Sequence, residues 1–112
     1  MNSKIKRLLY EWGSPPHLKG FDYIFKAVEI GIKNPESLHS ITKSVYPVIA
    51  KMTNSTASKV ERNIRTAKEI SLQNMDRETR EKNFGRTTDA LIAVPNGLYL
   101  TALVHTYCTT GV

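Results

Sequence analysis

The sequence has little of what metal-binding, disulfide-linked or catalytic domains require. Cys108 is the only cysteine among the 112 residues, so an internal disulfide and a zinc site built on cysteines are both excluded. His17, His39 and His105 lie far apart, without the three- or four-residue step that places two ligands on one helix face. We therefore expect no metal ion and no cofactor.

Long apolar runs and catalytic motifs are missing as well. No stretch approaches the roughly 20 consecutive apolar residues that span a bilayer, and the N-terminus does not resemble a secretion signal. The sequence also lacks a glycine-rich phosphate loop and a nucleophile paired with a base. We therefore expect a soluble, cytoplasmic protein that has no membrane partner and is not an enzyme.

The sequence does have an excess of positive charge. It contains 16 Lys and Arg against 10 Asp and Glu, which gives a formal net charge of +6. Such an excess attracts polyanions without identifying which one. A length of 112 residues without an internal repeat suits one domain. We therefore expect residues 1–112 to form a single domain.

Apolar residues recur at helical steps along most of the chain, which predicts an all-α fold, a compact bundle of about six helices. The first helix is expected over residues 3–12, with Ser3 as its cap and four buried side chains, Ile5, Leu8, Leu9 and Trp12. The most hydrophobic helix is expected over residues 17–33, where it forms the centre of the core. A third helix is expected over residues 36–45.

The C-terminal third is predicted to be less regular. Residues 73–89 are polar and charged, which indicates a mobile loop with about one helical turn. Residues 90–94 are expected to form a short apolar link and residues 95–97 a turn. The last helix is expected over residues 98–107, with three inward side chains, Leu100, Leu103 and Val104.

Residues 47–72 are typical of a helix-turn-helix. Pro47 suits the first position of a helix, and this helix is expected to bury Val48, Ile49 and Met52. Residues 54–56 form the predicted turn, because Asn54 tolerates a left-handed backbone and Thr56 can cap the next helix. Tyr46, just before the first helix, can reach a phosphate or pack inside.

The second helix of this motif has two distinct faces. An inward face is predicted from four residues at three- and four-residue steps, Ala57, Val60, Ile64 and Ala67. The opposite face carries Ser58, Lys59, Arg62, Arg65, Thr66 and Glu69. A DNA major groove admits such a helix, and there an arginine can bridge guanine while a carboxylate can accept from the cytosine amino group.

The neighbouring pair Glu61 and Arg62 favours contact with bases, because a helix that only attracted phosphates should avoid a carboxylate there. Lys43, Lys51, Lys59 and Arg65 would supply attraction that is independent of sequence. Three alternatives remain open: a solvated charged face, a protein-interaction module that binds an acidic partner, and an architectural DNA binder without sequence preference.

Three stretches resemble the C-terminal effector domain of the sporulation response regulator, stage zero sporulation protein A. They are GSPPHLKGFDYIFKAVEI, LHSITKSVYPVIAKMTNSTASKVERNIRTAKEI, and the FG of Phe84 and Gly85. The similarity covers most of residues 5–85, and the segments HLKGF and TASKVERNIR are long enough to be specific. After Asp89 the similarity weakens.

The resemblance implies a helical, DNA-binding transcription factor domain that binds promoter sites with a TGTCGAA-like core, often in tandem copies, and activates or represses transcription. By position, Glu61 and Arg62 would contact bases, and Ser58 and Arg65 bases or phosphates. Lys59 stands where the family usually has arginine, and Thr66 where it has a backbone-contacting histidine. Tyr46 and Lys51 complete the expected DNA-binding set.

The resemblance also implies two protein partners and one missing part. The region around Phe84 would contact the sigma subunit of RNA polymerase, and two copies would meet on tandem sites as a homodimer on DNA. Family members carry an N-terminal receiver domain, for which 112 residues leave no room, so we expect none. An excised domain and a natural receiver-less paralogue both remain open.

Overall fold

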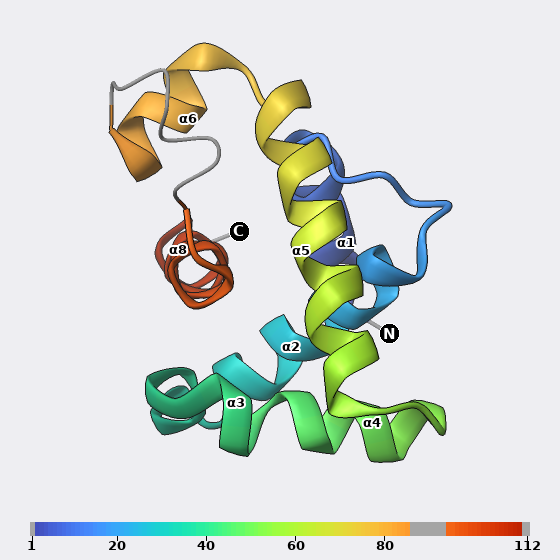
Figure 1. Ribbon diagram of the computed structural model, residues 1–112. Helices are drawn as coiled ribbons and strands as arrows, with labels where there is room; N and C mark the ends of the chain where they lie inside the picture. The colour runs from blue at the N-terminus through green and yellow to red at the C-terminus, as the bar shows by residue number, and fades with distance from the viewer. Residues whose placement is uncertain (1, 86–93, 111–112) are drawn as a thin grey trace.

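The computed structural model describes residues 2–85 and 94–110, which form helices joined by short connections (Figure 1). In chain order they are α1 (Ser3–Glu11), α2 (Lys19–Lys33), the 3-10 helix η1 (Pro35–Ser40), α3 (Ile41–Ser44), α4 (Tyr46–Thr53), α5 (Ala57–Asn74), α6 (Arg77–Phe84) and α8 (Asn96–Thr109). No strand occurs in the described ranges, so the all-α prediction is confirmed. Helix α5 contacts α2, α4 and α8.

Helix α1 buries the residues that the sequence predicted but begins differently. Ile5, Leu8, Leu9 and Trp12 are all buried, because they share the face that meets the core. The cap is Asn2, not Ser3: its Oδ1 accepts from the backbone N–H groups of Lys4 and Ile5 at 3.1 and 3.2 Å. The prediction of Ser3 as the cap is therefore wrong by one position.

Helix α2 lies behind α5 in Figure 1 and supplies buried side chains to the centre of the core, including Ile24, Ala27 and Val28. It begins at Lys19, two residues later than predicted. At Gly20 the two helices approach closely: a Cβ there would collide with the Asn63 carbonyl oxygen and lie 2.6 Å from Cβ of Ala67. Gly20 therefore allows α2 to pack against α5.

The predicted third helix is divided into η1 and α3. The division falls at Ser40, whose backbone (φ −152°, ψ 60°) is not helical. The start of η1 is fixed by Ser37, whose Oγ donates to the Asn34 carbonyl oxygen at 2.7 Å. Leu38 and Ile41, which the apolar pattern of residues 36–45 places on the inward side, are partly buried and pack against the core although the helix is not continuous.

The segment after α5 is more helical than the sequence predicted. Residues 77–84 form α6 instead of a loop with one turn, which corrects the prediction for the described part of 73–89. Asp76 caps this helix by accepting from the Glu78 N–H at 2.8 Å and from the Thr79 hydroxyl at 2.6 Å. Residues 86–93, which include most of the predicted apolar link, lie outside the described residues.

Helix α8 is seen nearly end-on beside α5 in Figure 1. It begins at Asn96, within the predicted turn, and Pro95 precedes it. The predicted inward residues Leu100, Leu103 and Val104 are buried, and Tyr99 is buried with them. Among the described helices, none is long and apolar enough to cross a membrane.

Candidate nucleic-acid interface

Helices α4 and α5 are joined by the turn that the sequence predicted. Asn54 has a left-handed backbone (φ 55°, ψ 48°), a conformation that asparagine tolerates better than most residues. The Ser55 N–H then donates to the Ala50 carbonyl oxygen at 2.8 Å, and Thr56 Oγ1 accepts from the Lys59 N–H at 3.2 Å. These bonds close the turn and begin α5, as a helix-turn-helix requires.

The buried face of α4 differs from the prediction. Ile49 is fully buried, but Val48 is 43% exposed and Met52 is 58% exposed. The residues that pack inward with Ile49 are Tyr46 and Ala50, so Val48 and Met52, four residues apart, share the outer face. The prediction that Val48 and Met52 are buried is wrong, because apolar character alone does not identify the inward face of a short helix.

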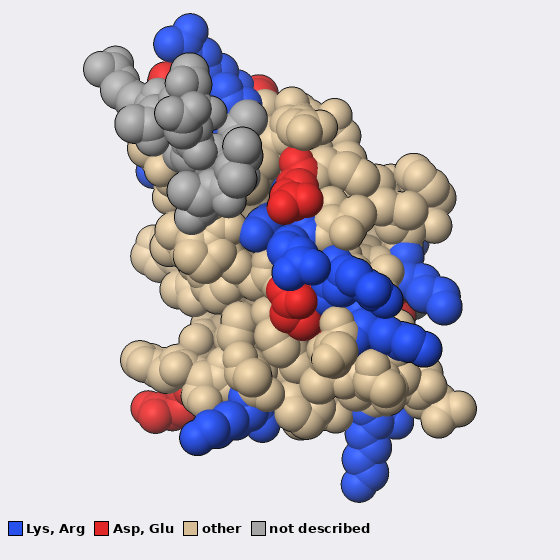
Figure 2. All heavy atoms as spheres, in the orientation of Figure 1, with Lys and Arg blue, Asp and Glu red and all other residues tan. Residues whose placement is uncertain are grey.

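Helix α5 has the two faces that its sequence predicted. Val60, Ile64 and Ala67 are fully buried, and Ala57 is partly buried against the core. The outward face consists of exposed residues: Ser58, Lys59, Arg62, Arg65, Thr66 and Glu69. Figure 2 shows Lys and Arg side chains gathered on the surface over α5, with acidic side chains beside them. A basic helix face is thus open to a large partner.

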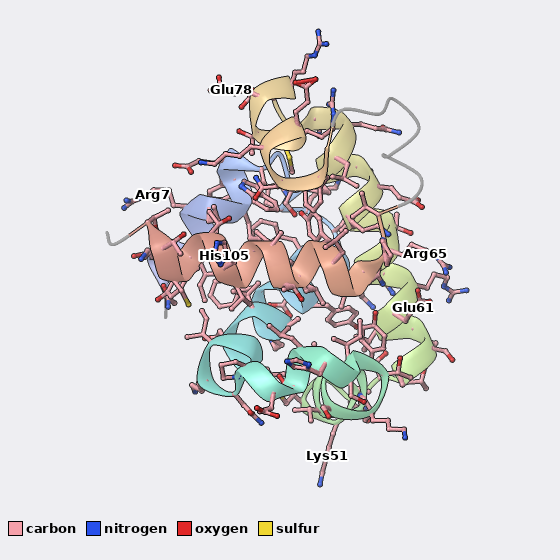
Figure 3. The ribbon with its side chains drawn as sticks, turned by 90° about the vertical axis from the view of Figure 1, so that its left-hand side faces the viewer. Arg7, Lys51, Glu61, Arg65, Glu78 and His105 are labelled. Atoms are coloured by element: carbon pink, nitrogen blue, oxygen red, sulfur yellow. The ribbon has the colours of Figure 1, made fainter. Side chains whose placement is uncertain are left out.

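Arg62 lies in the middle of this outward face. Its side chain is exposed, and among the described residues no hydrogen bond or ion pair to its guanidinium is found. Lys51 is exposed on α4 and points away from the body of the molecule, below α4 in Figure 3. Positive groups on both helices are therefore available to phosphates or bases.

Glu61 is held at the edge of the face next to α8. Its side chain is 36% exposed, and Oε2 accepts from Arg65 Nη1 at 3.2 Å. Oε2 also lies 3.4 Å from Nδ2 of Asn96, which donates as well to the Tyr46 hydroxyl at 3.0 Å and the Glu61 carbonyl oxygen at 3.3 Å. Figure 3 shows Glu61 and Arg65 adjacent on the outer side of α5.

Tyr46 lies beneath the surface and not on it. Its side chain is 4% exposed and its hydroxyl accepts from Asn96 instead of facing a phosphate. Burial raises the pKa of this hydroxyl above its ordinary value, and the hydrogen bond from Asn96 partly opposes that effect. Tyr46 therefore supports the interface from within.

Two residues that the sequence analysis did not single out join α8 to α5. Asn96 is 8% exposed, and Lys68 is 4% exposed with its Nζ donating to the Val94 carbonyl oxygen at 2.6 Å. Burial lowers the pKa of Lys68 below its ordinary value. A lysine at the border of a helix's apolar face, such as Lys68, is only a weak sequence signal for a buried contact. Asn96 is 35 residues from Glu61, so no helical periodicity connects these two residues.

Phe84 is partly buried at the end of α6. Its ring centroid lies 5.8 Å from that of Trp12 and 6.2 Å from that of Tyr99. These contacts hold α6 at the opposite end of α5 from α4 (Figure 1). The exposed side of α6 is polar and includes Arg77, Glu78 and Lys82.

The remaining residues that the sequence singled out do not form a second site. In the described ranges, no group of three His, Cys, Asp or Glu side chains is placed to hold a metal ion. Cys108 is exposed near the end of α8. Trp12 is buried as predicted, Phe21 and Tyr23 are buried as well, and Phe25 is partly buried against the core.

An exposed basic helix held by a helix-turn-helix is typical of the DNA-binding domains of transcription regulators. Residues 5–107 match the family described as "Sporulation initiation factor Spo0A C terminal", which covers nearly the whole chain, so the chain belongs to that family. This is a family of response-regulator effector domains that act in sporulation by binding double-stranded DNA, and it is not an enzyme family.

Proposed function

We propose that α5 lies in the major groove of a promoter site with a TGTCGAA-like core, where Arg62 contacts a guanine and Glu61 a cytosine. The observation that carries this proposal is the position of Arg62, exposed at the centre of the face and without a partner among the described residues. A guanidinium can donate to guanine O6 and N7 together. The TGTCGAA-like core is proposed from the resemblance of TASKVERNIR to the family.

The residues around Arg62 contact the sugar-phosphate backbone in this proposal. Ser58, Lys59 and Thr66 are exposed on the same face of α5. Arg65 is 48% exposed and paired with Glu61, a surface pair that is weak enough to exchange for a phosphate. Lys51 extends the positive surface to α4, which in a helix-turn-helix crosses the backbone.

The proposal includes two further partners. Two copies of the chain bind tandem sites as a dimer on DNA. The surface around α6 contacts the sigma subunit of RNA polymerase, with Phe84 holding that helix in place against Trp12 and Tyr99. The sigma contact is supported by the separation of α6 from α4 at opposite ends of α5 (Figure 1), because DNA on the basic face leaves α6 accessible. The dimer on tandem sites is proposed from the resemblance to the family.

Selection of sites from random duplexes, followed by titration of two variants, tests the proposed base contact. We expect Arg62→Ala to reduce the ratio of specific to random-duplex affinity by roughly 5- to 150-fold, the equivalent of about 1–3 kcal/mol for one bidentate base contact. Lys51→Ala is the matched control, since it should weaken binding to all duplexes alike and reduce the salt slope by about 0.9. An unchanged affinity ratio in Arg62→Ala would contradict the proposal.

The same titration separates the two alternatives. An architectural DNA binder would bind random and selected duplexes equally, with a strong dependence on salt. An interaction module for an acidic protein would bind neither duplex at micromolar concentration in moderate salt. Enrichment of one sequence during selection contradicts both alternatives.

A further inference from the structure

The N-terminal end of α8 is attached to the middle of α5 by two polar contacts. Lys68 donates to the carbonyl oxygen of Val94, just before α8, and Asn96 in the first turn of α8 donates to Glu61. Both donors are more than nine-tenths buried. The attachment lies beside the outward face of α5, where Figure 3 shows Glu61 and Arg65.

The amide of Asn96 contacts both the backbone and the side chain of Glu61. Its Nδ2 lies 3.3 Å from the Glu61 carbonyl oxygen and 3.4 Å from Oε2, and it donates to the Tyr46 hydroxyl at 3.0 Å. The Oδ1 atom of the same amide is buried and has no hydrogen-bond partner among the described residues. Burying a polar oxygen without a partner is unfavourable, and an apolar side chain would avoid this cost. We therefore attribute the role of Asn96 at this position to its two N–H donors.

These contacts engage only one of the two oxygens of the Glu61 carboxylate. Oε2 accepts from Arg65 and Asn96, whereas no donor to Oε1 is found within residues 2–85 and 94–110. An ionised carboxylate has about four acceptor positions on two oxygens, so Oε1 can accept from a cytosine amino group while Oε2 stays bound. Arg65 alone would hold Oε2 weakly, since the pair is exposed on the surface.

We propose that Asn96 is a positioning residue for base recognition: it fixes the Glu61 carboxylate from α8, so that the C-terminal helix sets the preference of α5 for cytosine. This inference rests on the proposed function, in which Glu61 contacts a base. Without the Asn96 donors, the Glu61 side chain is free to rotate, and Oε1 is no longer held where the cytosine amino group would meet it.

The test is a scan of every base pair of the selected site with wild-type protein and with the Glu61→Ala, Asn96→Ala and double variants. We expect Glu61→Ala to remove the preference at one cytosine, and Asn96→Ala to reduce that same preference by roughly tenfold, within the range of one base contact. The preference at the guanine contacted by Arg62 and the affinity for random duplex remain unchanged in Asn96→Ala. The double variant loses no more cytosine preference than Glu61→Ala.

Asn96→Asp is a second variant of almost identical shape that leaves no cavity, although it buries a carboxylate. It replaces the donor with a carboxylate that repels Glu61, so we expect at least as large a loss of cytosine preference, with the thermal midpoint recorded for each variant. A merely structural role would lower affinity at all positions together.

Besides such a uniform loss, two further results overturn the inference and are distinguishable. If Glu61→Ala abolishes the cytosine preference but Asn96→Ala and Asn96→Asp keep it, the positioning role fails and the base contact stands. If Glu61→Ala leaves every preference intact, the base contact of Glu61 fails and the role of Asn96 fails with it.

Discussion

Replacing Gly20 with alanine tests the close packing of α2 against α5, on which the placement of the basic face depends. A Cβ at this position collides with the backbone carbonyl oxygen of Asn63 and lies 2.6 Å from Cβ of Ala67. Neither atom is the end of a flexible side chain, so the two helices must separate. Such overpacking costs about 1–3 kcal/mol, whereas the helix-propensity gain of alanine over glycine is at most about 1 kcal/mol.

We therefore expect Gly20→Ala to lower the free energy of unfolding by about 1–2 kcal/mol. For a domain of this size each kcal/mol corresponds to a fall of roughly 4 °C in Tm, so the expected fall is about 4–8 °C. Thermal unfolding followed by far-UV circular dichroism measures it, and urea titration gives the free energy independently.

Two other helical glycines provide matched controls for the same substitution. At Gly97 the nearest atom to an added Cβ is Cδ1 of Ile41 at 3.6 Å, an ordinary contact, so Gly97→Ala should be neutral or stabilising by up to about 1 kcal/mol. At Gly31 the neighbours are the side chains of Val104 at 2.9 Å and Leu38 at 3.1 Å, which can move, so an intermediate loss is expected. A Gly20→Ala variant as stable as wild type would refute the reasoning.

Further variants test the corrected face of α4 and the cap of α6. Ile49→Ala should destabilise the domain by about 2–5 kcal/mol. Met52→Ser should change the free energy of unfolding by no more than about 0.5 kcal/mol, because Met52 is 58% exposed. Equal losses of stability in urea titrations would instead support the prediction that Met52 is buried. Hydrogen bonds from the Thr79 hydroxyl and the Glu78 N–H hold the pKa of Asp76 below 3.8. The unfolded chain therefore takes up this proton first as the pH falls. In urea titrations at different pH, the free energy of unfolding of wild type should exceed that of Asp76→Asn above pH 3.8, and this difference should shrink below pH 3.8. A difference that grows in acid would contradict the prediction.

The sequence predicted the outward face of α5 because a long helix has enough turns for its period to be unambiguous. Val60, Ile64 and Ala67 repeat over the inward side, and Asn54 and Thr56 mark the turn by their own backbone chemistry. In α4, by contrast, eight residues contain too few turns to separate the two apolar sides. The direction in which Met52 points was therefore set by the packing of α4 on its neighbours.

Other features depended on contacts between distant parts of the chain. Helix α6 has only Phe84 as an apolar anchor, and the partners of that ring, Trp12 and Tyr99, are far away in the sequence. The low apolar content of residues 77–84 thus concealed a helix that Asp76 caps. Asn96 likewise acts on Glu61 across 35 residues, a relation that no local pattern records.

The packing of α6 against the single tryptophan of the chain has a practical consequence. Trp12 is 3% exposed, and its indole lies nearly perpendicular to the Phe84 ring, with the ring centroids 5.8 Å apart. Water would reach the indole if α6 detached, and its fluorescence would shift to longer wavelength. The domain thus carries an intrinsic optical probe at the end remote from the basic surface, so that an event at α6 can be followed without a label while duplex is titrated onto α5.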